Sequence, residues 1–187
     1  PMVIAVRGYA VPIRAEEKPY VGKDKNGRQY RKALPRPSAY SVVFDTETDT
    51  DGAQHVRIGT YMVHKNAALI ESGIFYEPEN VSTDELVLLR TYCLQKGLTL
   101  RTREEFVREV FYRYGYRYGG LVLGFNLPFD LSRIATSSST SKGHDMRGGF
   151  SLELAPEKWL PNVLVKHLNS KTAFMRFAAA PRPVDGR

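Results

Sequence analysis

Three short apolar stretches, each closed by a turn, follow one another in the first half of the chain. Residues 39–47 read AYSVVFDTE, residues 55–64 read HVRIGTYMVH and residues 68–77 read ALIESGIFYE. Stretches of this length that are rich in β-branched and aromatic residues are typical of strands. An Asp-Gly turn signal separates the first two and a turn at Lys65 separates the second pair. The pattern therefore predicts an antiparallel meander of three strands.

The spacing of apolar positions then changes to that of helices. One predicted helix is capped by Thr83, and a second begins at Thr102, with Glu105 in the capping-box position. GGLVLGFN, which ends at residue 126, predicts a buried strand, and LPFDLSRIA predicts a helix with Pro128 in its first turn. Three further strands are predicted at 148–154, 162–168 and 172–178.

This order of elements predicts an α/β domain. The apolar strand at 121–125 is expected beside 41–45, because a strand that returns after a helical excursion usually lies next to an earlier strand. The polar segment at 136–145, TSSSTSKGHD, has low complexity and is expected to be a mobile loop.

Composition limits the class of protein. The 187 residues are 42% hydrophobic and 25% charged, which is ordinary for a globular domain with a core. The apolar runs are much shorter than a membrane span. Cys93 is the only cysteine, which excludes an intrachain disulfide and a cysteine-rich metal site. A reducing, cytoplasmic location is therefore expected.

Positive charge is concentrated near the N-terminus. The net charge is +7, and residues 1–37 hold nine Lys or Arg and three acids, so +6 of it lies there. Tyr20 and Tyr30 lie among these charges, and basic residues with interleaved aromatics suit nucleic acid. A solvated hairpin without a ligand is the alternative. The basic residues expected to contact nucleic acid are Arg28, Arg31 and Lys32.

Three parts of the chain are distinguished on this basis. Residues 1–37 are expected to be a basic extension, with a strand at 2–11 and a hairpin at the Asn-Gly turn of DKNGRQY. Residues 38–178 are expected to form the main domain, after a proline-bounded linker. Residues 179–187 are expected to be a linker or tail.

Carboxylates are concentrated where the first buried strand ends. Because side chains alternate along a strand, Asp45 and Glu47 should project from the same face. Asp130 is embedded between Phe129 and Leu131 in the late helix, and an acid in this apolar setting needs a partner. Three carboxylates from two neighbouring segments would form a site for a hard cation such as Mg²⁺ or Mn²⁺.

Plainer interpretations exist for these residues. An EF-hand calcium loop is disfavoured, because a strand precedes the acids and the spacing lacks the required glutamate. Asp49 and Asp51 are interpreted as turn residues, and Asp130 could instead pair with Arg133. YRYGYRYGG at 112–120 fits base stacking and the end of an amphipathic helix equally well.

FDTET at 44–48, followed about 80 residues later by GFNLPFDL, resembles the first two motifs of the DEDD (DnaQ-like) 3′–5′ exonuclease superfamily. GFNLPFDLSRIA is most similar to the proofreading exonuclease type of family B DNA polymerases. The resemblance implies a ribonuclease H-like fold over about residues 38–178, with a mixed sheet flanked by helices and a late β-hairpin.

The resemblance also implies a chemistry, the hydrolysis of phosphodiester bonds with two Mg²⁺ or Mn²⁺ ions. Asp45 would bridge both ions, Glu47 would hold the ion that carries the water, and Asp130 would bind the other. The positions expected to contact nucleic acid are Asn126, Phe129, Thr46 and Thr48.

One element of the family pattern is missing. The third motif of the family places a Tyr or His four residues before a further acid, and no such spacing follows Asp130. The simplest interpretation is that the chain stops before this motif. Alternatively Glu153 or Asp145 supplies the fourth acid, or the fold is a relict kept for binding.

The sequence therefore predicts a metal-dependent 3′–5′ exonuclease with nucleic acid as partner, and DNA is favoured over RNA. The alternative is a catalytically incomplete nuclease-like module that binds nucleic acid without cleaving it. Further domains or a partner protein would complete such a chain.

Overall fold

The computed structural model describes residues 21–23, 25–27, 29–31, 38–50, 52, 54–169 and 172–178. The chain divides into two units, Pro1–Pro37 and Ser38–Arg187. In the first unit, β1 (Val21–Lys23) and β2 (Gln29–Arg31) pair antiparallel, which confirms the predicted basic hairpin. The expected strand at 2–11, most of the proline-bounded linker and the tail at 179–187 lie outside the described residues.

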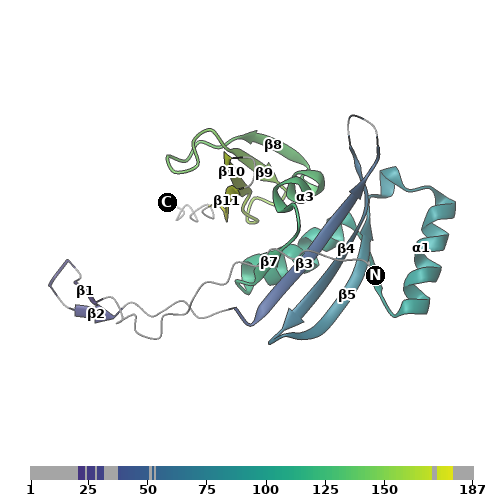
Figure 1. Cartoon of the computed structure of the whole chain (residues 1–187), viewed down its shortest axis with the longest axis horizontal. Coiled ribbons are helices and arrows are strands. Elements are labelled where there is room, and N and C mark those ends of the chain that lie inside the picture. Colours follow the sequence, from purple (N-terminus) through teal and green to yellow (C-terminus); the bar gives the residue numbers. More distant parts are fainter. Residues whose placement is uncertain are drawn as a thin grey trace, which may run out of the picture. The chain divides into compact units, whose positions relative to one another are not determined.

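A mixed five-stranded sheet forms the centre of the second unit (Figure 1). Its strand order is β6-β5-β4-β3-β7. The predicted meander is confirmed, because β3 (Tyr40–Thr48), β4 (Val56–Lys65) and β5 (Ala68–Tyr76) pair antiparallel in succession. The α/β class is confirmed as well, since helices connect the later strands of this sheet.

The two outer strands of the sheet run parallel to their neighbours. β7 (Leu121–Leu123) lies beside β3 with Ser41 opposite Leu121, as the sequence predicted. β6 (Thr99–Thr102) lies beside β5 and was not predicted. β3 is therefore an inner strand, with a neighbour on each side.

The main core lies between one face of this sheet and a long helical segment. Val42 and Phe44 of β3 are buried, whereas Val43 between them is only partly buried, as strand alternation requires. They pack against the π-helix η2 (Phe106–Arg117), which directly follows the short helix α2 (Arg103–Glu105). The ring of Phe106 stacks on that of Phe75 at 4.1 Å. The capping box at Thr102 is present as predicted.

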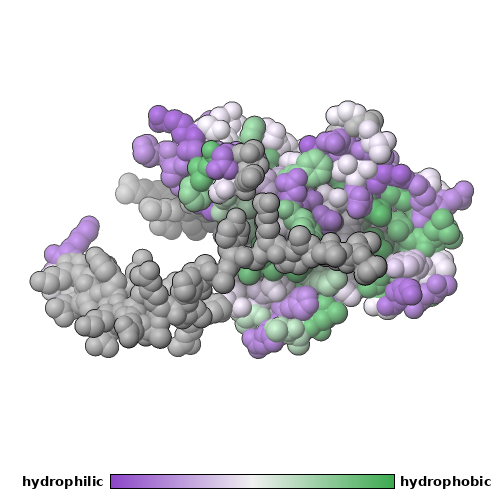
Figure 2. Space-filling view, in the orientation of Figure 1, coloured by the Kyte–Doolittle hydropathy of each residue, from purple (hydrophilic) through white to green (hydrophobic). Residues whose placement is uncertain are grey.

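Helix α1 (Thr83–Lys96) follows the short 3-10 helix η1 (Pro78–Asn80) and is buried only at Cys93. Its N-cap is Ser82 rather than Thr83, because Ser82 and Glu85 exchange both hydrogen bonds of a capping box. Because so little of α1 is buried, apolar side chains such as Leu88 and Leu94 lie on the surface. Figure 2 shows the hydrophobic colour over this helix.

The late strands form a second sheet of four antiparallel strands. Its order is β11-β10-β9-β8. The predicted strands near 150, 165 and 175 are β9 (Phe150–Glu153), β10 (Val163–Asn169) and β11 (Thr172–Phe177). The expected mobile loop at 136–145 was wrong in part, because β8 (Ser137–Thr140) pairs with β9 along its length.

Helix α3 (Leu127–Ile134) lies between the two sheets (Figure 1), with Pro128 in its first turn as predicted. It packs on β3 through Leu131 and Ile134, which belong to the main core. Among the described residues, no helix combines the length and apolar character that a membrane crossing requires.

Candidate functional site

The end of β3 carries the two acids of the FDTET stretch. Asp45 and Glu47 are exposed, whereas Thr46 between them is buried. Both carboxylates therefore project from the face opposite Phe44, which agrees with the shared face that the sequence predicted. Glu47, together with Thr48, lines a cleft of about 340 Å³ beside Leu88 of α1.

Asp130 reaches the same strand from α3. Its side chain is 1% exposed, and its Oδ1 accepts hydrogen bonds from the Thr46 backbone N–H at 3.3 Å and from Thr46 Oγ1 at 2.7 Å. Its Oδ2 has no hydrogen-bond partner among the described residues. A β-carbon added at Gly124 would lie 3.5 Å from this Oδ2, which is an ordinary van der Waals contact.

The environment of Asp130 opposes its ionisation. Burial raises its pKa above the usual 3.8, and the nearby charge of Asp45 raises it further, whereas the hydrogen bonds from Thr46 act in the opposite direction. A buried carboxylate with one unpaired oxygen and an acidic neighbour is a favourable position for a cation.

The three carboxylates approach one another through the backbone but are not gathered into one group. In the described part of the chain, no three His, Cys, Asp or Glu side chains lie close enough to hold a common metal ion. Asp130 lies on the Thr46 side of β3, and the alternation of side chains directs Asp45 and Glu47 to the other side. The donor set is all carboxylate, as Mg²⁺ and Mn²⁺ prefer, and the unpaired Oδ2 suits such an ion. The shared metal site remains a prediction.

Asn126 and Phe129 lie on a different side of α3 from Asp130. Both line a cleft of about 520 Å³ between α3 and the four-stranded sheet. The backbone carbonyl of Asn126 accepts the hydrogen bonds from the N–H groups of Phe129 and Asp130, which begins the helix. α3 therefore presents its acid to β3 and its Asn-Phe pair to this cleft.

Arg133, the alternative partner expected for Asp130, makes its contacts elsewhere. The Nε of Arg133 donates to Ser132 Oγ, its Nη1 donates to the carbonyl of Gln54, and its guanidinium lies 4.8 Å from the centre of the Phe129 ring. The side chain that donates a hydrogen bond to the Asp130 carboxylate is Thr46, and not an arginine.

The two alternative fourth acids are both engaged on the four-stranded sheet. Asp145 forms an ion pair with Arg176 at 3.0 Å. Glu153 Oε2 accepts a hydrogen bond from Ser137 Oγ at 2.9 Å. These contacts lie within that sheet and its loop.

The basic residues expected to contact nucleic acid lie mostly outside the described residues. Arg28 and Lys32 lie outside the described residues, and Arg31 is described only as a backbone position in β2. In the Tyr-Arg segment, Tyr112 and Tyr114 are buried, and Tyr112 Oη donates to the carbonyl of Pro161, so the helical interpretation is confirmed for these two.

Several relevant residues were missed by reading the sequence. Thr46 was expected to contact nucleic acid, but it is buried and holds Asp130. Phe150 and His167 line the cleft beside α3, and only the period-2 pattern of their strands pointed to a shared face.

Comparison of the chain with protein-family models, curated proteins and solved structures found no match.

Proposed function

We propose that this chain carries a metal-dependent nuclease site of the ribonuclease H-like type, acting on DNA as a 3′–5′ exonuclease. The observation that carries the proposal is the parallel pairing of β7 with β3, followed directly by α3. This connection brings the acid of the second motif, Asp130, to the strand that bears Asp45 and Glu47. A meander, a returning parallel strand and an acidic helix are the order that the resemblance implies.

The chemistry of the proposal follows from the carboxylates. Asp45, Glu47 and Asp130 would hold Mg²⁺ or Mn²⁺, which when bound polarises a phosphoryl oxygen and makes a water more acidic. Thr46 keeps Asp130 turned toward β3 with two hydrogen bonds. Asp45 and Glu47 remain open to solvent, where a phosphodiester can approach them.

Cation binding and cleavage test the proposal together. Mn²⁺ titration followed by calorimetry should show binding to the unmodified chain and at least tenfold weaker binding to Asp45→Asn and Asp130→Asn. Cleavage of a 5′-labelled oligonucleotide should proceed from the 3′ end and fall by about 100-fold or more in both variants, because carboxylate placement supplies the catalysis.

Asp49→Asn is the matched control. Asp49 lies two residues beyond Glu47 and pairs with Arg57 at 3.5 Å, so its loss should leave Mn²⁺ binding and cleavage unchanged. Equal activity of Asp45→Asn and Asp49→Asn would overturn the proposal. Cleavage of closed circular DNA would replace the exonuclease with an endonuclease of the same site, because circles have no ends.

A second candidate function is a nucleic-acid-binding module without cleavage. It is favoured by one observation, that no three carboxylates of the described residues form a common metal group. This function predicts that the chain binds DNA in the presence of EDTA, that Asp45→Asn binds equally well, and that neither protein cleaves it.

A further inference from the structure

The cleft beside α3 is separate from the three carboxylates. Its volume is about 520 Å³, within the range of ligand pockets in proteins. One wall is the side of α3 that carries Phe129 and Arg133, and the other is the inner face of the four-stranded sheet. Asp130 lies on a different side of the same helix, against Thr46.

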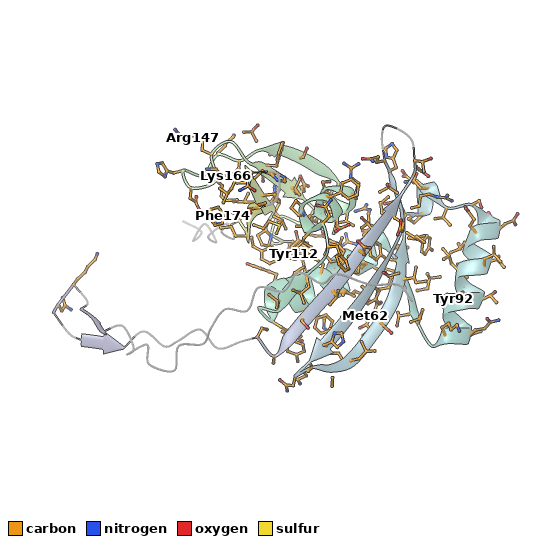
Figure 3. All side chains as sticks on the ribbon, viewed as in Figure 1. Met62, Tyr92, Tyr112, Arg147, Lys166 and Phe174 are labelled. Carbon is orange, nitrogen blue, oxygen red and sulfur yellow. The ribbon has the colours of Figure 1, made fainter. Side chains whose placement is uncertain are left out.

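Strand register identifies which residues of the sheet face this cleft. Phe150 of β9 is paired with Val165 of β10, and directly paired residues of antiparallel strands share a face. His167 lies two residues beyond Val165 and so projects from that face too. Phe174 is paired with Lys166 and lies on the opposite face; both are labelled in Figure 3.

The lining of the cleft combines aromatic rings with positive charge. Phe129 and Phe150 supply two rings, and the guanidinium of Arg133 lies over the first of them. Hydrogen bonds to Ser132 and to the carbonyl of Gln54 hold that guanidinium in place. No carboxylate is among the described residues that line the cleft, so no acidic side chain of the lining repels an anion.

We infer that this cleft binds one unstacked nucleotide of a single-stranded nucleic acid, with its base against Phe150 and its phosphate near Arg133 and His167. Aromatic rings stack on exposed bases of any sequence, and basic side chains attract the adjacent phosphate. A duplex keeps its bases stacked inside, so the cleft selects single strands. The ligand class rests on the proposed function, but the site needs neither a metal ion nor cleavage.

Binding of a fluorescein-labelled oligothymidylate, followed by anisotropy in EDTA, tests the inference. Phe150→Ala and His167→Ala should each raise the Kd, by about tenfold for the phenylalanine. Phe174→Ala is the matched control, because it removes the same side chain from the same sheet at similar exposure, 60% against 54%. The control should bind as the unmodified chain does.

Further measurements test whether a loss of binding comes from misfolding, and whether the cleft binds a strand, a duplex or a free nucleotide. Phe150→Tyr keeps a ring and should restore binding, and thermal unfolding reports whether Phe150→Ala folds. A duplex of equal length should be insensitive to Phe150→Ala, and free thymidine monophosphate should compete only at far higher concentration than the strand.

Three results would count against the inference. Equal Kd values for Phe150→Ala and Phe174→Ala would overturn it and leave the proposed function intact. An equal loss of duplex and single-strand binding in Phe150→Ala would also overturn it. Absence of any nucleic-acid binding by the unmodified chain would overturn both this inference and the proposed function.

Discussion

Asp130 is a buried carboxylate with half of its hydrogen-bonding capacity satisfied. Both hydrogen bonds that reach it from β3 come from Thr46, and both end on Oδ1. Burying an ionisable group is costly unless it is paired, so Thr46 offsets part of that cost. At this position a threonine does what a charged partner usually does.

Removing the hydroxyl of Thr46 should therefore destabilise the fold. We expect Thr46→Val, which keeps the shape of the side chain, to lower the free energy of unfolding by about 1–3 kcal/mol, measured in urea. Thr46→Ser keeps the hydroxyl and should cost clearly less. Equal losses in the two variants would show that the methyl group, and not the hydrogen bond, matters.

The raised pKa of Asp130 predicts a pH dependence in buffer with EDTA. Because its folded-state pKa lies above the unfolded value near 3.8, the folded chain holds this proton more tightly. The group therefore contributes less stability as pH rises through the folded pKa. As pH rises from the unfolded value near 3.8 through the folded pKa, the stability of the unmodified chain relative to Asp130→Asn should fall, as urea unfolding at several pH values can show.

Asp145 provides a control of opposite sign. Partial desolvation acts to raise the pKa of this exposed carboxyl, but hydrogen bonds from the local backbone and from Arg176 outweigh this and lower it. Relative to Asp145→Asn, the unmodified chain should gain stability as pH rises from below its folded pKa to above the unfolded value. The same slope for both variants would contradict the assignment.

Among the elements, α1 depends on its ends more than on its faces. Only Cys93 is buried along its length, and the N-terminal end is held by Ser82, Glu85 and Arg57. Hydrogen bonds from the Ser82 backbone and from Arg57 lower the pKa of Glu85 to about 2. The helix is therefore expected to open without unfolding the sheet.

Loss of the N-cap should act locally. We expect Ser82→Ala to speed amide exchange in the first turns of α1 by about fivefold, equivalent to about 1 kcal/mol, while exchange in β3 and β4 stays unchanged. Thr102→Ala removes the other capping box, which precedes the buried η2, and should instead lower global stability. Equal global losses in both would contradict a locally opening α1.

Elements that bury apolar side chains could be predicted from the sequence, whereas an element held only by backbone hydrogen bonds could not. The meander and α3 have apolar residues at strand or helix spacing, and burial of those residues determines their structure. β8 is Ser-Ser-Ser-Thr and exposed along its length, so no buried side chain defines it, and its pairing with β9 does. No side-chain pattern in the sequence records such pairing.

The candidate site divides in the same way. The shared face of Asp45 and Glu47 follows from the alternation of side chains within one strand and was predictable. The contact of Asp130 with Thr46, and the cleft between α3 and β9, depend on how separate elements pack. The pattern of residues along one chain does not say which separate elements pack together.

For the whole molecule, the uneven charge predicts how nucleic-acid binding responds to salt. Each neutralised phosphate releases counterions, with a slope of about 0.7 per contact on single strands. Replacing Arg28, Arg31 and Lys32 by Gln should lower the slope of log Kd against log salt by about 2. Replacing Arg90, Lys96 and Lys158 by Gln removes the same charge elsewhere and should change the slope less.

The pairing of Ser41 with Leu121 joins positions 80 residues apart. A chain must close that long loop before β7 can dock, and the entropy of closure delays contacts of this kind. Asp130 reaches Thr46 only after docking, so the meander can assemble early, whereas the site forms only once β7 has paired with β3. A chain emerging from the ribosome would thus form its three-stranded meander well before its carboxylates could act together.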